Sequence, residues 1–194
     1  MHRIVVLASG AGSLLQALID SPVRPSIAAA GSDVADATAL TRASDAGIAT
    51  FVVPITADRA VWDEQLADRL VAISPDYVVC AGFMRVLGPS VLGAFPGRII
   101  NSHPALLPAF AGAHAVRDAL AYGAKVTGCT VHVVDAGIDT GPLIAQQPVI
   151  VSDDDDESSL HERIKQVERV LLVDIVQGIV DRGLVVDGRS VSFG

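Results

Sequence analysis

The sequence predicts an α/β protein with a single doubly wound, mostly parallel sheet and helices on both of its faces. Short apolar segments rich in β-branched residues alternate with segments of helical spacing, as at 4–8, 76–81 and 98–100. Continuous apolar strands are typical of buried parallel sheets, and regular strand–helix alternation is typical of doubly wound folds. Because 51% of the 194 residues are hydrophobic, the chain can bury a sizeable core, and we expect one domain over residues 1–194.

The composition narrows the partners and the compartment. A formal net charge of −8 and a pI near 4.9 argue against a nucleic-acid backbone as the main partner. Cys80 and Cys129 lie in separate apolar segments, which suits buried thiols in a reducing compartment better than a disulfide framework. No signal peptide or membrane span is expected, because the first apolar run is short and charged residues interrupt the last one. We therefore expect a cytoplasmic protein, and the sequence leaves open whether it forms a homodimer.

The amino-terminal segment, 4–18, predicts a strand, a glycine loop and a helix that Ser13 would cap. This arrangement directs free backbone amides and the positive end of a helix toward an anion. Gly10 and Gly12 lack the third small residue of a dinucleotide fingerprint, since Leu15 stands at that position. The spacing alone therefore fits a ligand loop and a plain sharp turn equally well.

The remaining elements continue the alternation. A helix that Thr56 could cap is expected to bury a stripe of leucine and isoleucine residues. An acidic run at 153–157 is interpreted as the start of a helix, stabilised by the helix dipole, and not as a metal cluster. The other expected elements are strands at 27–30, 50–53, 131–134 and 143–151, helices at 35–46, 114–122 and about 158–182, and a last edge strand within 184–192.

Polar side chains follow the apolar strand that begins at residue 98. Asn101 and His103 stand two positions apart at its carboxyl end, so both should point to the same side of the strand. They would enter the crevice where open α/β sheets bind ligands. Ser102, between them, is expected to point to the opposite face of the sheet.

The next apolar strand, 131–134, leads into a glycine-rich turn that contains Asp139. This turn can bring the Asp139 carboxylate back to the imidazole of His103. An amide, an imidazole and a carboxylate together can bind an oxyanion and move a proton. His132 lies in the middle of the strand and is interpreted as a structural residue.

These residues resemble the signature of the folate-dependent formyltransferases, and the resemblance covers nearly the whole chain. The matching positions form a strand end, a loop and a turn: Asn101–Pro108, Gly112, His114 and Asp139–Pro142. The likeness is to family members that act on glycinamide ribonucleotide. It implies a Rossmann-like formyltransferase fold and transfer of the formyl group of 10-formyltetrahydrofolate to the amine of that ribonucleotide in purine synthesis, without a metal. Asn101 and protonated His103 would hydrogen-bond the oxyanion, while Asp139 orients His103.

The resemblance also implies a ribonucleotide site. The family holds its substrate phosphate at the glycine loop, which assigns Gly12, Ser13 and Leu14 to the ribonucleotide. Ala11 and Leu14 stand where the family pattern has asparagines, so side-chain contacts at these two positions are in doubt. Glu168 resembles a glutamate that reaches the substrate ribose. From the residues alone it can also be a solvated helix residue.

The folate site implied by the resemblance uses a loop and two arginines. Met84, Arg85, Val86 and Leu87 belong to a loop that wraps the pteridine through its backbone. Arg59 would contact the glutamate tail of the folate, although a solvated charge explains it equally well, and Asn101 would touch the folate as well. The amino-terminal half is thus assigned mainly to the nucleotide phosphate, and the carboxyl-terminal half to catalysis and the folate.

Three other classes of protein are compatible with parts of the sequence. A formyltransferase for initiator methionyl-tRNA, or a formyltetrahydrofolate hydrolase, would share the catalytic residues but should carry a further domain, which we do not expect. A nicotinamide-dependent oxidoreductase is disfavoured by the incomplete glycine pattern. A non-catalytic nucleotide-binding module would not need Asn101, His103 and Asp139 together.

Overall fold

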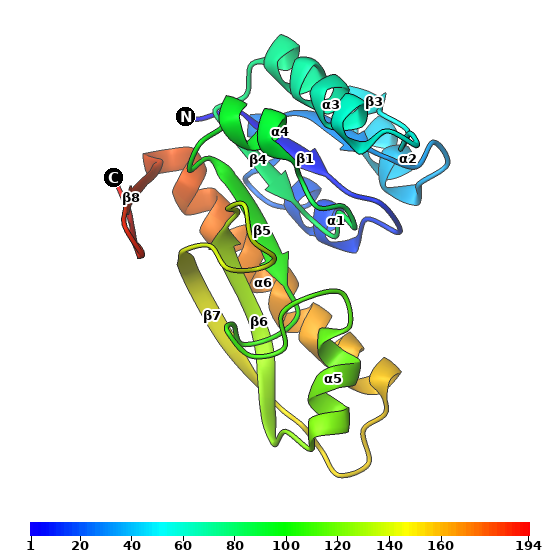
Figure 1. Ribbon diagram of the computed structural model, residues 1–194, viewed down its shortest axis with the longest axis vertical. Helices are drawn as coiled ribbons and strands as arrows, with labels where there is room; N and C mark the ends of the chain where they lie inside the picture. Colours follow the sequence, from blue (N-terminus) through cyan, green and yellow to red (C-terminus); the bar gives the residue numbers. More distant parts are fainter.

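The computed structural model describes residues 1–194 and contains one seven-stranded sheet in the order β3-β2-β1-β4-β5-β6-β7. Strands β1 to β5 pair in parallel, whereas β6 pairs antiparallel with both β5 and β7 (Figure 1). The strands are β1 Ile4–Leu7, β2 Ile27–Ser32, β3 Thr50–Val52, β4 Tyr77–Cys80, β5 Ile99–His103, β6 Val126–Val133 and β7 Leu143–Ile150. The predicted mostly parallel sheet is confirmed. Its order reverses direction between β1 and β4, where doubly wound sheets bind ligands.

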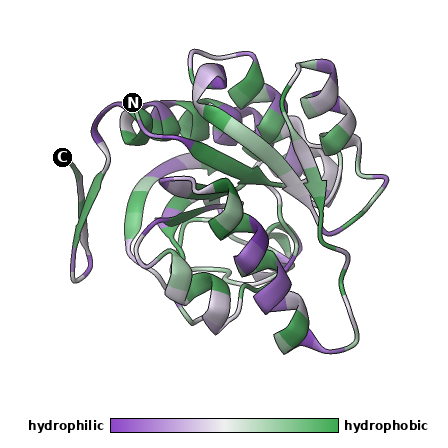
Figure 2. Cartoon of the chain, turned by 90° about the horizontal axis from the view of Figure 1, so that it is seen from above, coloured by the Kyte–Doolittle hydropathy of each residue, from purple (hydrophilic) through white to green (hydrophobic).

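Helices cover both faces of the sheet, as predicted. They are α1 Ser13–Ile19, α2 Thr38–Asp45, α3 Arg59–Ile73, α4 Pro89–Ala94, α5 Ala115–Tyr122 and α6 Glu157–Arg182. Because side chains alternate along a strand, Ile4 and Val6 of β1 join a core cluster with α1, α2 and α6. Val5 and Leu7 join a second cluster with α3 and α4 on the other face. Hydrophobic residues accordingly follow the strands in Figure 2, and hydrophilic ones lie mainly on helices and loops.

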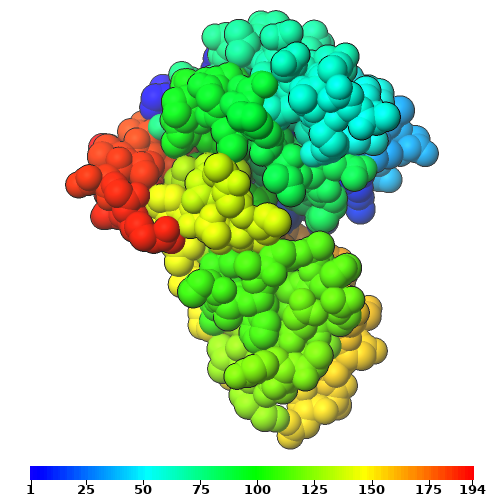
Figure 3. All heavy atoms as spheres, in the orientation of Figure 1, coloured from blue at the N-terminus to red at the C-terminus, as the bar shows by residue number.

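Helix α6 has 26 residues and extends beyond the parallel part of the sheet. Its amino-terminal half packs with α5, β6 and β7 in a third core cluster, made of Val116, Cys129, Val149, Leu160 and Ile164. The molecule therefore has a broad part built on β1 to β4 and a narrower part that includes α5 (Figure 3). No helix combines the length and the apolar composition that crossing a membrane requires.

The carboxyl-terminal tail differs from the expected edge strand. It forms a separate two-stranded sheet, β8 Leu184–Asp187 and β9 Ser190–Phe193, which stands beside the main sheet (Figure 1). Gly183 ends α6 with a φ of 74° and turns the chain away. The tail can then pair with itself through a tight turn at Gly188, whose φ is 58°.

Two expected helix caps were also wrong. Gly12, with a φ of 71°, precedes α1, so Ser13 is the first helical residue and makes no capping hydrogen bond. Asp58 caps α3 instead of Thr56, because its carboxylate accepts from the amides of the first turn at 2.9 and 3.2 Å. The Thr56 hydroxyl donates to the Asp58 carbonyl at 2.6 Å and so supports that cap from outside the helix.

Candidate active site

A cavity of about 350 Å³ lies at the carboxyl ends of β4 and β5. Its walls come from both halves of the chain and comprise the loop 82–87, the end of β5 with Pro104, residues 112–116, and the turn that follows β6. The wall is largely apolar, and a few polar groups converge on it, which is the usual composition of a small-molecule site. The predicted catalytic residues Asn101, His103 and Asp139 all line this cavity.

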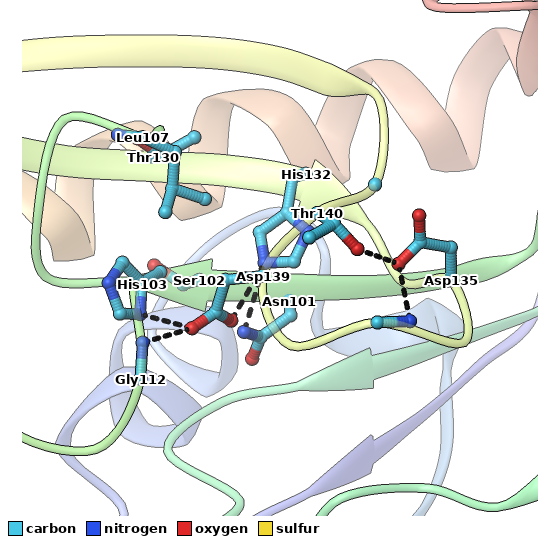
Figure 4. A network of polar contacts seen from close by, with 12 residues as sticks. Asn101, Ser102, His103, Leu107, Gly112, Thr130, His132, Asp135, Asp139 and Thr140 are labelled. Atoms are coloured by element: carbon cyan, nitrogen blue, oxygen red, sulfur yellow. Dashed lines mark hydrogen bonds and ion pairs between the residues drawn. The ribbon is translucent and has the colours of Figure 1, made fainter. Parts of the chain in front are cut away.

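The end of β5 divides its side chains between the two faces of the sheet. Ser102 points toward α6, where its hydroxyl donates to Oε1 of Glu168 at 2.6 Å. Asn101 and His103 point the other way, toward β6 and the Asp139 turn (Figure 4). The alternation predicted from the sequence is therefore present.

His103 lies between two oxygen acceptors. Its Nδ1 is 3.3 Å from Oδ2 of Asp139, and its Nε2 is 2.9 Å from the carbonyl oxygen of Phe110. A carboxylate and a carbonyl only accept hydrogen bonds, so the doubly protonated imidazolium is the form that can donate to both. The side chain is 6% exposed, which keeps water from competing for these contacts.

Asp139 is held from several sides. Its Oδ2 accepts the Gly112 N–H at 2.9 Å, and its Oδ1 is 3.5 Å from Nε2 of His132 (Figure 4). The hydrogen bond to His132, helped by the Gly112 amide and the charges of both histidines, lowers the pKa of Asp139 to about 2 although burial opposes this shift. The carboxylate is therefore ionised throughout the neutral pH range.

The structure corrects the interpretation of His132 as a purely structural residue. It stands opposite Asn101 in the β5–β6 register, and its Nε2 is 3.2 Å from Nδ2 of Asn101. Its Nδ1 is 3.0 Å from the carbonyl oxygen of Val133. The ring thus lies between the Asn101 amide and the Asp139 carboxylate and helps to fix the position of both side chains. Only the register of an antiparallel pair reveals this contact, and the sequence does not display that register.

The loop predicted to hold the folate, residues 82–87 and called the folate loop below, forms one wall of the cavity. Leu87 is buried, whereas Met84 and Val86 are 72% and 59% exposed at the rim. Large apolar side chains exposed beside a cavity are suited to cover a bound aromatic ligand. The position of Met84, Val86 and Leu87 is thus compatible with the predicted role.

Both arginines that are predicted to bind the folate make hydrogen bonds within the protein. Arg59 donates from Nη2 to the carbonyl of Val86 at 2.8 Å, and its guanidinium lies over the Trp62 ring at 4.4 Å. It fastens the folate loop without lining the cavity. Arg85 lines the cavity and pairs through Nε with Oδ2 of Asp33 at 2.6 Å.

The predicted phosphate residues lie apart from this cavity, at the carboxyl end of β1. None of the backbone amides of residues 10–15 has an acceptor within the protein. Leu14 is only 6% exposed and belongs to the core, so it can offer a ligand only its backbone. Packing alone explains a glycine at position 12, because a Cβ there would lie 2.7 Å from Ala39 of α2.

Glu168 is not a solvated helix residue. It is 5% exposed, and its carboxylate accepts from Ser102 beneath the sheet, outside the cavity lining. Burial raises the pKa of Glu168, and the hydrogen bond from Ser102 opposes that shift. Lys165 and Arg169 on the same helix also favour the charged form.

A doubly wound sheet that brings an amide, an imidazole and an ionised carboxylate together at one cavity has the groups that a group-transfer enzyme requires. Residues 2–176 match the family described as formyl transferase, so the chain belongs to the formyl transferase family. The family and the enzyme class predicted from the sequence are confirmed.

Named relatives agree with this assignment. The chain is 52% identical over 197 residues to a phosphoribosylglycinamide formyltransferase of Mycobacterium tuberculosis, covering 99% of this chain and 91% of the relative. It is 39% identical over 185 residues to the protein of that name from Escherichia coli, covering 92% and 87%. Among solved structures, glycinamide ribonucleotide transformylase 1 from Symbiobacterium toebii superposes with a TM-score of 0.95 at 42% identity, over 100% of this chain and 94% of that one.

Proposed function

We propose that the protein transfers the formyl group of 10-formyltetrahydrofolate to the amine of glycinamide ribonucleotide, giving formylglycinamide ribonucleotide and tetrahydrofolate in purine synthesis. The observation that carries the proposal is the convergence of Asn101, His103 and Asp139 on one cavity. The names of the relatives with 52% and 39% identity support the choice of substrates.

In the proposed reaction the amine nitrogen attacks the formyl carbon and a C–N bond forms. The carbonyl oxygen becomes an oxyanion, which the Asn101 amide and the His103 imidazolium are placed to stabilise by hydrogen bonds. When the intermediate collapses, the bond between the formyl carbon and N10 of the folate breaks. The amine loses a proton and N10 gains one, so the overall reaction needs no external acid or base.

Asp139 is a poor general base at neutral pH. A carboxylate with a pKa of about 2 accepts protons weakly at neutral pH. We therefore assign Asp139 mainly to orienting His103 and stabilising its charge. The amine becomes acidic enough to lose its proton only once the intermediate has formed.

The two substrates would approach the reacting atoms from different loops. The free amides of Gly12, Ser13 and Leu14 are proposed to bind the ribonucleotide phosphate, because unpaired amides at a helix start attract anions. The folate is proposed to lie in the cavity along residues 84–87, with Asn101 at its formyl end, and Arg59 supports this loop from behind. Glu168 is buried and paired with Ser102, so a contact with the ribose would require its carboxylate to reorient.

The direct test is formyl transfer to synthetic glycinamide ribonucleotide, followed by the appearance of tetrahydrofolate. A wild-type protein that produces none refutes the proposal. Titration with NADH addresses the oxidoreductase alternative, because tight NADH binding without folate binding would favour it. We place the reaction in the cytoplasm because both cysteines are buried and unpaired. The sequence leaves the oligomeric state open, and sedimentation would distinguish a monomer from a homodimer.

A further inference from the structure

A buried carboxylate joins the two loops that follow β1 and β4. Asp33 directly follows β2, and its side chain is 0% exposed. Its Oδ1 accepts from the Ser9 hydroxyl at 2.6 Å, and its Oδ2 accepts from Nε of Arg85 at 2.6 Å. Burying a charge is unfavourable unless the charge is paired and hydrogen-bonded, and Asp33 satisfies both conditions through these two residues.

Ser9 links Asp33 to the folate loop by hydrogen bonds to both. Its Oγ accepts the Met84 N–H at 2.9 Å, and its own N–H donates to the carbonyl of Gly82 at 3.0 Å. Because the carboxylate can only accept, the Ser9 hydroxyl must donate to Asp33 and receive from Met84. The direction of both hydrogen bonds is thereby set, and the start of the folate loop is held against the end of β1.

Arg85 extends the same contact into the cavity. Its Nε is bound to Asp33, no protein acceptor contacts its two Nη groups, and its side chain lines the cavity. A guanidinium held in this way presents its Nη groups as a planar fork, which matches the oxygens of a carboxylate. Without Asp33, the long Arg85 side chain, which is 37% exposed, would have several orientations available.

We propose that Asp33 is a positioning residue for the folate half of the site. It holds the Arg85 guanidinium directly and the Met84 amide through Ser9, at the place where the co-substrate is bound. This inference rests on the proposed function, since it takes a formylfolate as the ligand of the cavity. It predicts that losing the Asp33 carboxylate weakens folate binding selectively, because the catalytic residues lie on β5 and the Asp139 turn.

The test varies each substrate separately for Asp33→Ala, Arg85→Ala and the double variant. Asp33→Ala should raise KM for 10-formyltetrahydrofolate on the order of tenfold, the loss expected for one hydrogen bond to a charged group. The KM for glycinamide ribonucleotide should change less than about twofold. Losses in the double variant should be far from additive, because Asp33 acts partly through Arg85. Asp33→Asn keeps one acceptor oxygen and the side-chain shape, so it should recover part of the loss.

A matched control is Asp76→Ala. This aspartate accepts from the backbone of Arg3 at 2.7 Å at the opposite end of the sheet, so both KM values should stay unchanged. If Asp33→Ala does not fold, Ser9→Ala breaks the same connection from the surface side and should raise the folate KM alone. Equal rises in both KM values, additive losses in the double variant, or an unchanged folate KM in Ser9→Ala would overturn the positioning role.

Calorimetric titration with 5-formyltetrahydrofolate, a stable isomer of the co-substrate, separates this inference from the proposed function. A wild type that binds this folate more tightly than Asp33→Ala supports the positioning role, even if no glycinamide ribonucleotide is formylated. If the wild type and Asp33→Ala bind it equally, the role of Asp33 is refuted while the proposed reaction stands. A wild type with neither folate binding nor formyl transfer refutes both.

Discussion

Three consecutive residues of β5 have different tasks because a strand alternates its side chains. Asn101 and His103 face the cavity, where His132 lies 3.2 Å from the Asn101 amide. Ser102 faces α6, and its hydrogen bond offsets part of the free-energy cost of burying Glu168. Catalysis and stability should therefore separate cleanly between neighbouring positions.

Replacing Asn101 and Ser102 in turn tests this separation. Asn101→Ala removes the proposed oxyanion donor, so kcat should fall on the order of 10²–10³ while the thermal midpoint Tm changes little. Ser102→Ala should leave kcat nearly unchanged but lower the free energy of unfolding by about 1–3 kcal/mol, because the buried Glu168 carboxylate loses its partner. Steady-state kinetics and thermal denaturation measure both effects. A larger kcat loss in the serine variant would contradict the assignment of the two faces.

Asp139→Asn removes the charge beside His103 and keeps much of the shape. The expected loss in kcat is roughly 10²–10⁴, with the KM of each substrate close to that of the wild type. Stopped assays at saturating concentrations of both substrates measure it. Full turnover by the folded asparagine variant would exclude the carboxylate from the mechanism.

The same substitution has a pH signature in stability. Because the folded protein lowers the pKa of Asp139 from 3.8 to about 2, the ionised group stabilises the fold by about 2 kcal/mol above pH 4. This contribution is lost as the pH falls from about 4 to about 2, where the folded state must also bind the proton. Denaturant unfolding between pH 7 and pH 2 should show a shallower decline in Asp139→Asn than in the wild type. Parallel declines would argue against the lowered pKa.

At the scale of elements, the β8–β9 hairpin supports the turn that contains Asp139. Arg189, in the hairpin, donates to the carbonyls of Thr140 and Gly141 at 3.1 and 3.4 Å. Asp139 just before them has a φ of 54°, a strained value for a residue other than glycine. Asp135 braces the turn as well, by accepting from the Thr140 hydroxyl at 2.7 Å.

Arg189→Met tests whether the hairpin helps to hold this turn. It keeps an unbranched side chain but removes the two hydrogen bonds, so kcat should fall about five- to thirtyfold, the equivalent of about 1–2 kcal/mol for the loss of one or both bonds. The KM for glycinamide ribonucleotide should change little, because the glycine loop lies apart from the cavity, whereas the folate KM should rise modestly, because this turn is one wall of the cavity. Arg3→Met, at the amino end of β1, is the control with an exposed arginine. A kcat equal to that of the control would show that the turn holds its shape unaided.

The glycine loop offers a matched pair of substitutions. A side chain at Gly10 meets nothing within 4 Å, whereas one at Gly12 meets Ala39 at 2.7 Å and requires a φ of 71°. Gly10→Val should therefore raise the KM for the ribonucleotide and leave Tm and the folate KM almost unchanged. Gly12→Val should destabilise the protein by about 1–3 kcal/mol or more, whatever the ligand. An unchanged ribonucleotide KM in Gly10→Val would argue against phosphate binding at this loop.

At the scale of the whole molecule, α6 connects the two parts that border the site. Its carboxyl-terminal half packs in the core beneath β1 and β4, and its amino-terminal half packs with α5 and β6. The cavity opens where the parallel strands end and the antiparallel pair begins. Residues from both halves of the chain therefore meet at one site: the folate loop comes from the first half, and the turn that contains Asp139 comes from the second.

The sequence by itself determined the fold class and indicated the candidate catalytic groups. Apolar strands and helical spacing are local patterns, so they predicted nearly every element and the shared direction of Asn101 and His103. The expected ends of helices were less accurate, since Asp58 and Gly12 hold positions that were assigned to Thr56 and Ser13. Several residues can satisfy a helix start, and the surrounding chain decides among them.

The tertiary structure alone decided contacts between residues far apart in the chain. The β5–β6 register places His132 against Asn101, the packing of α6 buries Glu168 under Ser102, and the end of β2 brings Asp33 to Arg85. For none of these polar groups does the local sequence pattern indicate which residue will be its partner. A buried polar side chain must find a partner wherever the fold offers one, and that choice is made only when distant strands and helices pack together.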